Sequence, residues 1–379
     1  MTRNFFSALF LWIICSFLVF FCFVIAASAQ GLKPRPAHVG FIYPLSTNGI
    51  EAPQQTNNFS LHILAGVSYQ ENALCISGIS ALVKHETHGL MFSGISNHVG
   101  HKAYGVQIAG ILNQVKGDAQ GAQIAGFANV TGSADGAQVA GFANISKDAR
   151  GAQVAGFANN ARSSDAQVAG FANIAKSSNA AQVAGFINVA KDANTQVAGF
   201  INIARKVSGV QVAGLINIAE ESDYPIGLIN IIKKGEKQIG VSVDETGNTL
   251  VNFRSGGKIL YGIIGAGVNF NDENARYVLE GGMGAHFNFT KNFRTNLEVV
   301  SSAMSDLQYD VYMKSTARLL AAFKIANRIE IFAGPTFNYL GYERGQADIR
   351  NDRYLWKDKD RNHVDGLYFG AMGGIQVNL

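Results

Sequence analysis

The sequence has few cysteines and few prolines for its length. Only 3 cysteines and 6 prolines occur among 379 residues, beside 42 glycines and 25 phenylalanines. Cys15 and Cys22 fall in the first apolar run, so Cys75 is the only thiol in the rest of the chain. A single thiol cannot close an intramolecular disulfide, and the fold must therefore depend on hydrogen bonds and packing. We expect Cys75 to be a small buried core residue.

An excess of charge of one sign is also missing. The 31 basic and 27 acidic residues give a net charge of +4, and this near balance argues against a nucleic-acid partner. The sequence contains no Gly-x-Ser-x-Gly elbow, phosphate-binding loop or dinucleotide fingerprint. We therefore expect a protein that is not an enzyme, with no catalytic residues and no cofactor.

Long apolar runs are confined to the N-terminus. Arg3 precedes an almost uninterrupted apolar run over 5–25, and small residues at 27–29 match a signal-peptidase cleavage box. We interpret residues 1–29 as a cleaved signal peptide, with an uncleaved membrane anchor as the alternative. This interpretation predicts an exported protein.

A repeat with the core spelling Gln-Val-Ala-Gly-Phe-Ala-Asn occupies the middle of the chain. Its glutamines recur with spacings of 14, 15 or 16 residues, at Gln107, Gln123, Gln138, Gln153, Gln167, Gln182, Gln196 and Gln211. Degenerate copies extend the repeat over 73–232. The mid-unit glycine and the lack of a 3.6-residue apolar period exclude a helix. Each unit is interpreted as a strand followed by a polar turn, for example at 146–150 or 162–165.

Two architectures fit such a unit. In a meander, each repeat is a strand that runs antiparallel to the one before it, and turn length absorbs the variation in spacing. In a solenoid, each repeat is a coil stacked in register on its neighbour, and the amides and phenylalanines form ladders. The sequence alone leaves both open, and the relative direction of the strands that carry Gln138 and Gln153 distinguishes them.

The C-terminal third shows a clearer alternation. Over 293–304, 312–326 and 328–340, apolar residues occupy one face and every charge occupies the other. Longer and shorter connections alternate, ending with the long segment 343–365 and a last strand that reaches Leu379. This arrangement is typical of an outer-membrane β-barrel, with short periplasmic turns, longer outer loops and membrane lipid as its partner.

Two stretches resemble known bacterial protein families. The sequences 316–320 and 331–335 look like the late hairpin of outer-membrane β-barrel proteins. The Gly-x-Gln-x-Ala-Gly-Phe-x-Asn units, followed by 225–230, resemble a bacterial surface-repeat-containing protein family. The resemblance implies a surface location and no established activity, and it carries over no catalytic residues. An extracellular ligand of unknown nature is a separate expectation for the partner of this chain.

Two groups of residues are candidates for function. The charges on the inner face of the C-terminal strands either line a water-filled pore or pair into a network that plugs it; they are Glu280, Arg294, Glu298, Arg318, Lys324, Arg328 and Glu330. Tyr354 and Trp356 lie in the long charged connection and are candidates for contact with an outside partner.

Two His-x-x-His pairs occur in consecutive turns, at His85 and His88 and at His98 and His101. In a solenoid these turns lie at the same end of neighbouring coils, whereas in a meander they lie at opposite ends. We interpret the histidines as solvated turn residues and predict no metal site.

These observations predict one all-β assembly with a signal peptide at 1–29, N-terminal strands at 36–72, the repeat at 73–232 and barrel strands at 233–379. The six strands expected from residue 258 onward cannot close a barrel alone, so others must join them. We expect the repeat strands to join, giving an antiparallel outer-membrane barrel built largely from ~15-residue units. The alternative is a small barrel completed by the N-terminal strands, with the repeat as an inserted β-solenoid. The first architecture favours a structural or passive pore role, and the second a binding or adhesion role.

Overall fold

The computed structural model describes residues 34–308, 311–350, 353–360 and 362–379, so the predicted signal peptide lies outside the described residues. The structure is 75% strand and 2% helix, which confirms the all-β class. The chain divides into two compact units between Asn179 and Ala180, and each is described by itself.

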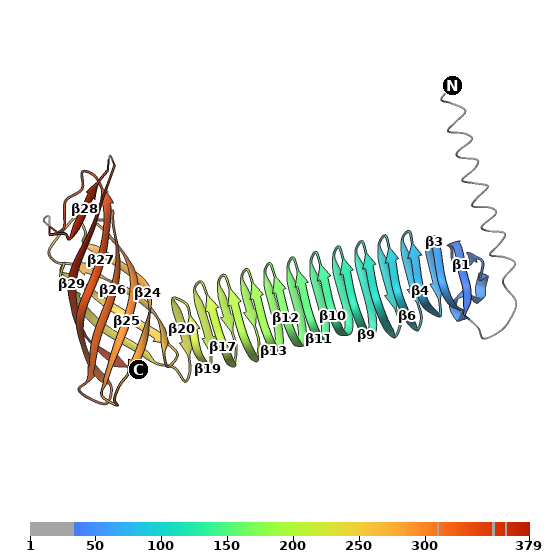
Figure 1. The fold of residues 1–379 in the computed structure, drawn as a ribbon, viewed down its shortest axis with the longest axis horizontal. Coiled ribbons are helices and arrows are strands. Elements are labelled where there is room, and N and C mark those ends of the chain that lie inside the picture. The colour runs from blue at the N-terminus through green and yellow to red at the C-terminus, as the bar shows by residue number, and fades with distance from the viewer. Residues whose placement is uncertain (1–33, 309–310, 351–352, 361) are drawn as a thin grey trace, which may run out of the picture. The chain divides into compact units, whose positions relative to one another are not determined.

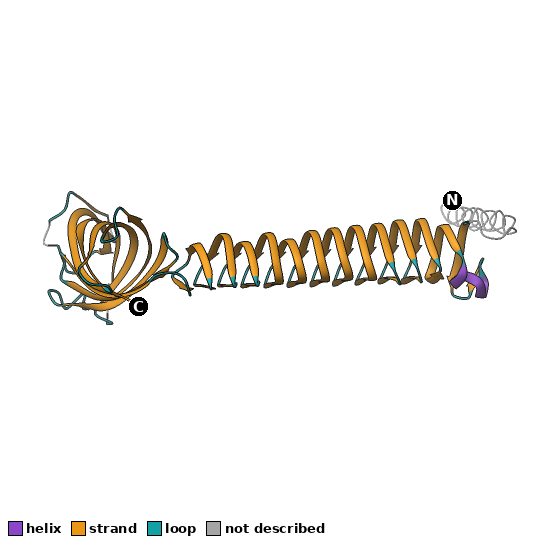
Figure 2. Ribbon diagram, turned by 90° about the horizontal axis from the view of Figure 1, so that it is seen from below, coloured by secondary structure: helices purple, strands orange, loops and turns teal. Residues whose placement is uncertain are grey.

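The first unit is a solenoid of parallel strands (Figures 1 and 2). Its elements are β1 (Arg35–Ile42), β2 (Leu45–Ser46), the 3-10 helix η1 (Gly49–Gln54), β3 (Thr56–Ser68), β4 (Gln70–Ser77), β5 (Ser80–Val83), β6 (Glu86–Ser93), β7 (Ser96–Val99), β8 (Lys102–Ala109), β9 (Leu112–Ala125), β10 (Ala128–Ala140), β11 (Ala143–Ala155), β12 (Ala158–Ala169) and β13 (Ala172–Ala184), whose last residues belong to the second unit.

The repeat units stack in register. Strands β10 and β11 are parallel, with Asn129 opposite Asn144 and Gln138 opposite Gln153. The prediction of a large barrel built from the repeats is therefore wrong, and a solenoid beside a small barrel is observed. The physical reason is the identity of the buried residues. An amide side chain donates and accepts at the same time, so identical amides one coil apart bond to each other, and the asparagine N–H groups also reach backbone carbonyls.

The breaks between the coil strands differ from the predicted turns. Strand β11 includes the polar segment 146–150, where its inside–outside alternation is interrupted at Lys147 and Asp148, and the breaks between strands fall at Gly141–Phe142 and at Gly156–Phe157. A second corner falls at Gly151, whose φ of 121° is costly for residues with a side chain. Because the bend interrupts the alternation, Phe142 lies outside and is 41% exposed.

The N-terminal strands begin the solenoid. Strand β1 pairs in parallel with β3 and antiparallel with β2, so its outer edge is covered. A terminal pairing of this kind protects a solenoid from edge-to-edge association. The alternative also expected the N-terminal strands to complete the barrel, and this part of it is wrong. Strands β1 and β3 form their backbone hydrogen bonds within the solenoid.

The second unit contains further coils and then a barrel. The coil strands are β14 (Ile187–Val189), β15 (Asp192–Ala198), β16 (Ile201–Ile203), β17 (Lys206–Ala213), β18 (Ile216–Ala219), β19 (Glu221–Ile226) and β20 (Ile229–Ile232). The barrel elements are β21 (Lys237–Asp244), β22 (Asn248–Gly256), β23 (Leu260–Asn269), β24 (Tyr277–Asn288), β25 (Phe293–Ser305), β26 (Val311–Lys324), β27 (Ile329–Glu343), the short β28 (Trp356–Lys359) and β29 (His363–Asn378).

Eight antiparallel strands close the barrel, because β21 pairs with β22 on one side and with β29 on the other. Six of these strands match the predicted ones. The two that complete the ring, β21 and β22, follow the repeat directly. Their alternation is weaker in sequence because Gln238 and Ser242, which face inward in the middle of β21, are uncharged.

The last coils of the second unit contact the barrel at the end where its connections are short. The backbone N–H of Asn230 donates to the Ser255 hydroxyl at 3.0 Å, and its side-chain amide donates to the Ser255 carbonyl at 3.2 Å. Ser255 lies beside the short connection 257–259. The turns 289–292 and 325–328 and the end of β29 lie at the same end of the strands. The long connection between β27 and β29 lies at the opposite end.

Candidate functional site

Buried ion pairs occupy the barrel interior. The Glu298 carboxylate accepts hydrogen bonds from Arg254 Nε at 2.9 Å and from the Tyr261 hydroxyl at 2.9 Å. Arg318 Nη1 lies 3.4 Å from the other oxygen of Glu298, and Arg318 also pairs with Glu280. Glu298 is 0% exposed, and its partners are buried as well. Strands on several sides of the ring therefore meet in one network of charges.

A second buried group lies nearer the short-turn end. Arg294 donates to Glu236 Oε2 at 2.7 Å and to Glu330 Oε2 at 2.6 Å. Gln376 on the last strand donates to the same Glu330 oxygen at 2.7 Å. Arg294 thus joins the start of the barrel chain to its last strands.

The structure places the seven predicted inner charges in two classes. Five of them are buried inside the barrel and make the contacts just described: Glu280, Arg294, Glu298, Arg318 and Glu330. Lys324 and Arg328 are exposed at the turn between β26 and β27, because the strand alternation ends there. Sequence reasoning missed Arg254, Asp244 and Glu236, which pair with Glu298, Lys314 and Arg294. Lys314 itself lies on the face of 312–326 that was predicted to carry the charges.

The outer face of the barrel is apolar. On β25, Leu297 and Val299 point outward between the inward Asn296 and Glu298. The same alternation repeats around the ring, with exposed residues that include Val241, Val251, Leu279, Met283, Met313, Leu319, Phe323, Ile331, Phe337, Phe369 and Ile375. The barrel therefore has an apolar outer face, which is unusual for a protein in water. Its interior contains both the ion pairs and buried apolar clusters, for example around Leu250, Met304 and Leu340.

The two aromatic residues of the long connection differ in exposure. Trp356 on β28 is 49% exposed. Tyr354 is half-buried: its hydroxyl donates to Asp348 Oδ1 at 2.8 Å, and its ring packs against Tyr368 at 6.0 Å. Trp356 is therefore available for contact, whereas Tyr354 helps to hold the connection on the barrel.

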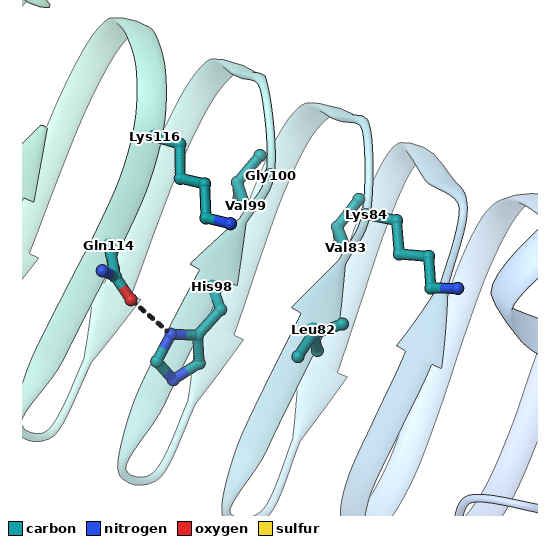
Figure 3. A pocket seen from close by; sticks show the side chains of 8 residues that line it. All are labelled: Leu82, Val83, Lys84, His98, Val99, Gly100, Gln114 and Lys116. Atoms are coloured by element: carbon teal, nitrogen blue, oxygen red, sulfur yellow. Dashed lines mark hydrogen bonds between the residues drawn. The ribbon is translucent and has the colours of Figure 1, made fainter. Parts of the chain in front are cut away.

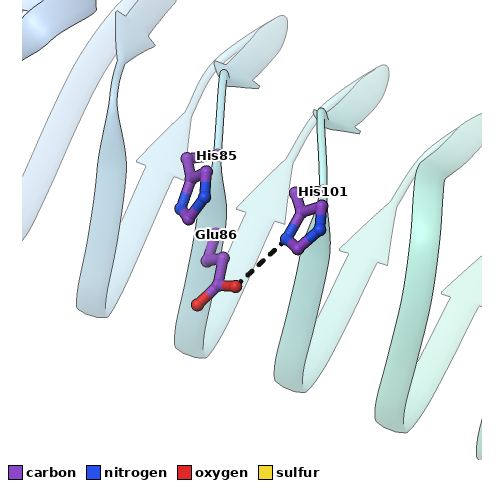
Figure 4. Close-up of side chains that lie close together, drawn as sticks. All are labelled: His85, Glu86 and His101. Atoms are coloured by element: carbon purple, nitrogen blue, oxygen red, sulfur yellow. Dashed lines mark hydrogen bonds and ion pairs between the residues drawn. The ribbon is translucent and has the colours of Figure 1, made fainter.

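The solenoid brings predicted turn histidines together. His85 and His101 lie one coil apart with their rings stacked at 5.1 Å, and Glu86 lies beside them (Figure 4). His88 Nε2 is 3.7 Å from the second oxygen of Glu86. His98 points elsewhere and bonds Gln114 at 3.0 Å. The proximity of turns on neighbouring coils agrees with the solenoid interpretation of the two pairs.

A surface cavity of about 280 Å³ opens beside His98 (Figure 3). Lys84, Gly100 and Lys116 occupy equivalent positions on three successive coils. The two lysines therefore lie on either side of Gly100 in this cavity. A Cβ atom at Gly100 would lie 2.0 Å from the Lys84 carbonyl oxygen, so the close approach of the two coils requires glycine here. Both lysines are exposed, and the structure gives them no buried polar partner in the cavity.

A buried titratable cluster lies in the first coils. The Glu71 carboxylate is fully buried and accepts hydrogen bonds from the Ser60 hydroxyl at 2.7 Å and from the Asn57 amide at 3.1 Å. Burial raises the pKa of Glu71 to about 7. His38 and His62 contact each other through ring nitrogens at 3.2 Å, and burial lowers their pKa values to about 3 and about 4. Because Glu71, His38 and His62 are buried and bonded within the coils, we interpret them as residues that stabilise the fold.

Comparison with known proteins gives no relative for this chain. No protein-family model matches it, and neither the curated proteins nor the solved structures contain a match. Within the described residues, no helix is long and apolar enough to cross a membrane.

Proposed function

We propose that this chain is a non-enzymatic outer-membrane protein in which the eight-stranded barrel is a lipid-embedded anchor and the coils form a binding or scaffolding module. The observation that carries the proposal is the apolar outer face of the barrel, on which Leu297 and Val299 are exposed while Glu298 and Arg318 are buried inside. A barrel in water would be more stable with a polar outer face. Lipid removes the apolar outer face from water, and the inward charges are neutralised by ion pairing.

An anchor is favoured over a passive pore by the accessibility of the interior. A water-filled channel leaves its lining residues in contact with solvent. Here Arg254, Glu298 and Glu330 are almost completely buried and bonded to other side chains. Charged and apolar side chains together fill the lumen, as in small barrels whose interior is occupied by side chains.

Reconstitution of the purified full chain tests the anchor. We expect it to require detergent for solubility and to give no stepwise conductance in planar bilayers after correct folding, which its heat-dependent migration in gels would report. A chain that stays monodisperse in plain buffer would refute the membrane anchor. Regular single-channel steps would instead support a pore.

A binding role for the coils is the second part of the proposal. Exposed apolar residues recur at the same place on successive coils, with Phe142 and Phe157 stacked at 4.9 Å and Val139 and Val154 beside them. Such a ladder repeats one contact at the spacing of parallel strands, about 4.8 Å. A ligand with its own repeat, such as a polymer or another solenoid, would match it. Loss of ligand capture after Phe142→Ser and Phe157→Ser, with intact membrane insertion, would support this role.

A further inference from the structure

We propose that His85, Glu86 and His101 form a binding site for one divalent transition-metal ion, of which Zn²⁺ is the best chemical match. The ion would link two neighbouring coils near the N-terminal end of the solenoid. This proposal does not depend on the membrane anchor, because all three residues lie in the first unit.

The backbone places the two imidazoles one above the other. His85 lies between β5 and β6, and His101 lies at the same corner of the next coil, between β7 and β8. The N–H of His101 donates to the carbonyl of His85 at 2.9 Å, so the two positions are fixed by the coil itself. Their rings are stacked with 15° between the planes.

The ligand atoms already converge. One atom each from His85, Glu86 and His101 lies within 4.8 Å of the others (Figure 4). Glu86 Oε1 is 3.1 Å from His101 Nδ1, and His85 Nδ1 is buried without a hydrogen-bond partner. Ligand atoms around tetrahedral Zn²⁺ are about 3.3 Å apart, so modest side-chain rotations close the site. A metal ion would also satisfy the buried nitrogen of His85, which is otherwise costly.

The chemistry of the donors selects the class of ion. Two imidazoles and one carboxylate favour Zn²⁺, Ni²⁺ or Cu²⁺ over Ca²⁺ and Mg²⁺, which prefer oxygen ligands. His88 lies 3.7 Å from the remaining carboxylate oxygen of Glu86 and can hold it in orientation. Lys102 is the register partner of Glu86 on the next coil.

The repeat confines the site to one pair of coils. The hydrogen-bonded ladder through His85 and His101 continues to Tyr69 on the preceding coil and to Gly117 on the following one. Neither residue supplies an imidazole or a carboxylate. The site therefore predicts one ion per chain.

Calorimetric titration of the full chain with ZnCl₂ tests the site, using protein in detergent without a histidine tag. We expect one Zn²⁺ per chain, and we expect His101→Ala to weaken binding at least about tenfold. Binding should also weaken in acid, because protons compete with the metal for its ligand atoms. The matched control is His98→Ala, which removes a histidine of the same coils that bonds Gln114 and Ser96 and should leave the affinity unchanged.

The proposal fails if the wild-type chain binds no stoichiometric Zn²⁺, if the double variant H85A/H101A retains wild-type affinity, or if H98A weakens binding as much as H101A. Far-UV circular dichroism establishes that each variant is folded. If a variant does not fold, the visible absorption spectrum of the wild-type chain loaded with Co²⁺ tests the proposal instead. Intense bands of a four-coordinate site with nitrogen and oxygen ligands support the proposal, and the weak spectrum of hydrated Co²⁺ overturns it.

Discussion

Buried asparagines in the middle of the coils, such as Asn144, are bonded to the coil on either side. Asn144 Nδ2 donates to Asn159 Oδ1 at 3.0 Å and to the Val154 carbonyl at 2.8 Å, and Asn144 Oδ1 accepts from Asn129 at 2.9 Å. Asn144→Ala leaves these buried partners unsatisfied, and we expect a loss of about 1–3 kcal/mol in the stability of the solenoid. Urea unfolding followed by circular dichroism measures it. Asn160→Ala is the matched control, because Asn160 is exposed and should change stability by less than about 0.5 kcal/mol.

Glu71 makes the stability of the first coils depend on pH. Its pKa rises from 4.5 to about 7 on folding, so its contribution is complete below pH 4.5 and is lost as pH rises through 7. At ~1.4 kcal/mol per pKa unit, ionisation costs the folded state about 3 kcal/mol. We expect Glu71→Gln to match the wild-type stability at pH 4.5 and to exceed it at pH 8. Urea midpoints measured between these pH values provide the test, and equal midpoints at pH 8 would contradict it.

His38 and His62 act in the opposite direction. Their pKa values fall from 6.5 to about 3 and about 4 on folding, so the stability that they contribute is present above pH 6.5 and is lost as pH falls. As the pH falls below 6.5, the stability lost through the two histidines exceeds the stability gained through the Glu71 carboxyl. The cluster should therefore be most stable between about pH 6.5 and 7.

At the scale of the strand, the outer face of β25 tests the lipid contact. Val299 is 58% exposed on the barrel wall, and an arginine there would cost about 2–4 kcal/mol if lipid covers it. In water the same change would cost almost nothing. The control is Leu307→Arg, since Leu307 is 74% exposed in the connection after β25. Folding yields and unfolding free energies in lipid vesicles distinguish the two outcomes. Equal values for both variants would argue against a membrane.

The strands that could be predicted from sequence are those with charges opposite apolar residues. Strand β25 is an example, because Arg294 and Glu298 mark its inner face and Leu297 its outer face. The coil strands gave a weaker signal, since their core is made of amides and alanines while Val139 lies outside. Hydrophobic alternation assumes an apolar core and therefore cannot orient such a strand.

The histidine cluster shows a second limit. The spacing between His85 and His101 equals one coil, so their proximity follows once a solenoid is assumed. The part played by Glu86 does not follow. It depends on the corner geometry, which directs the carboxylate across the coil boundary toward His101. Coil-to-coil contacts of this kind require the register, and the sequence left the register open.

For the whole molecule, the end of the barrel at which the coils enter determines their side of the membrane. Outer-membrane barrels place their short turns and C-terminus in the periplasm and their long loops outside. Here Asn230 of the last coil contacts Ser255 at the short-turn end, whereas β28 belongs to the long connection at the other end. The anchor proposal therefore predicts periplasmic coils and replaces the expected extracellular ligand with a periplasmic one.

Cysteine labelling of intact cells tests this sidedness. Asp358→Cys lies in β28 and should react with a membrane-impermeant maleimide, because β28 belongs to the outer loop. Ser208→Cys lies on an exposed coil position and should react only after the outer membrane is permeabilised. Cys75 is 1% exposed and should remain unlabelled in both variants, so the wild-type chain provides the background. Labelling of Ser208→Cys on intact cells would place the coils outside and would favour an adhesion role, because the exposed phenylalanine ladder would then face the surroundings of the cell.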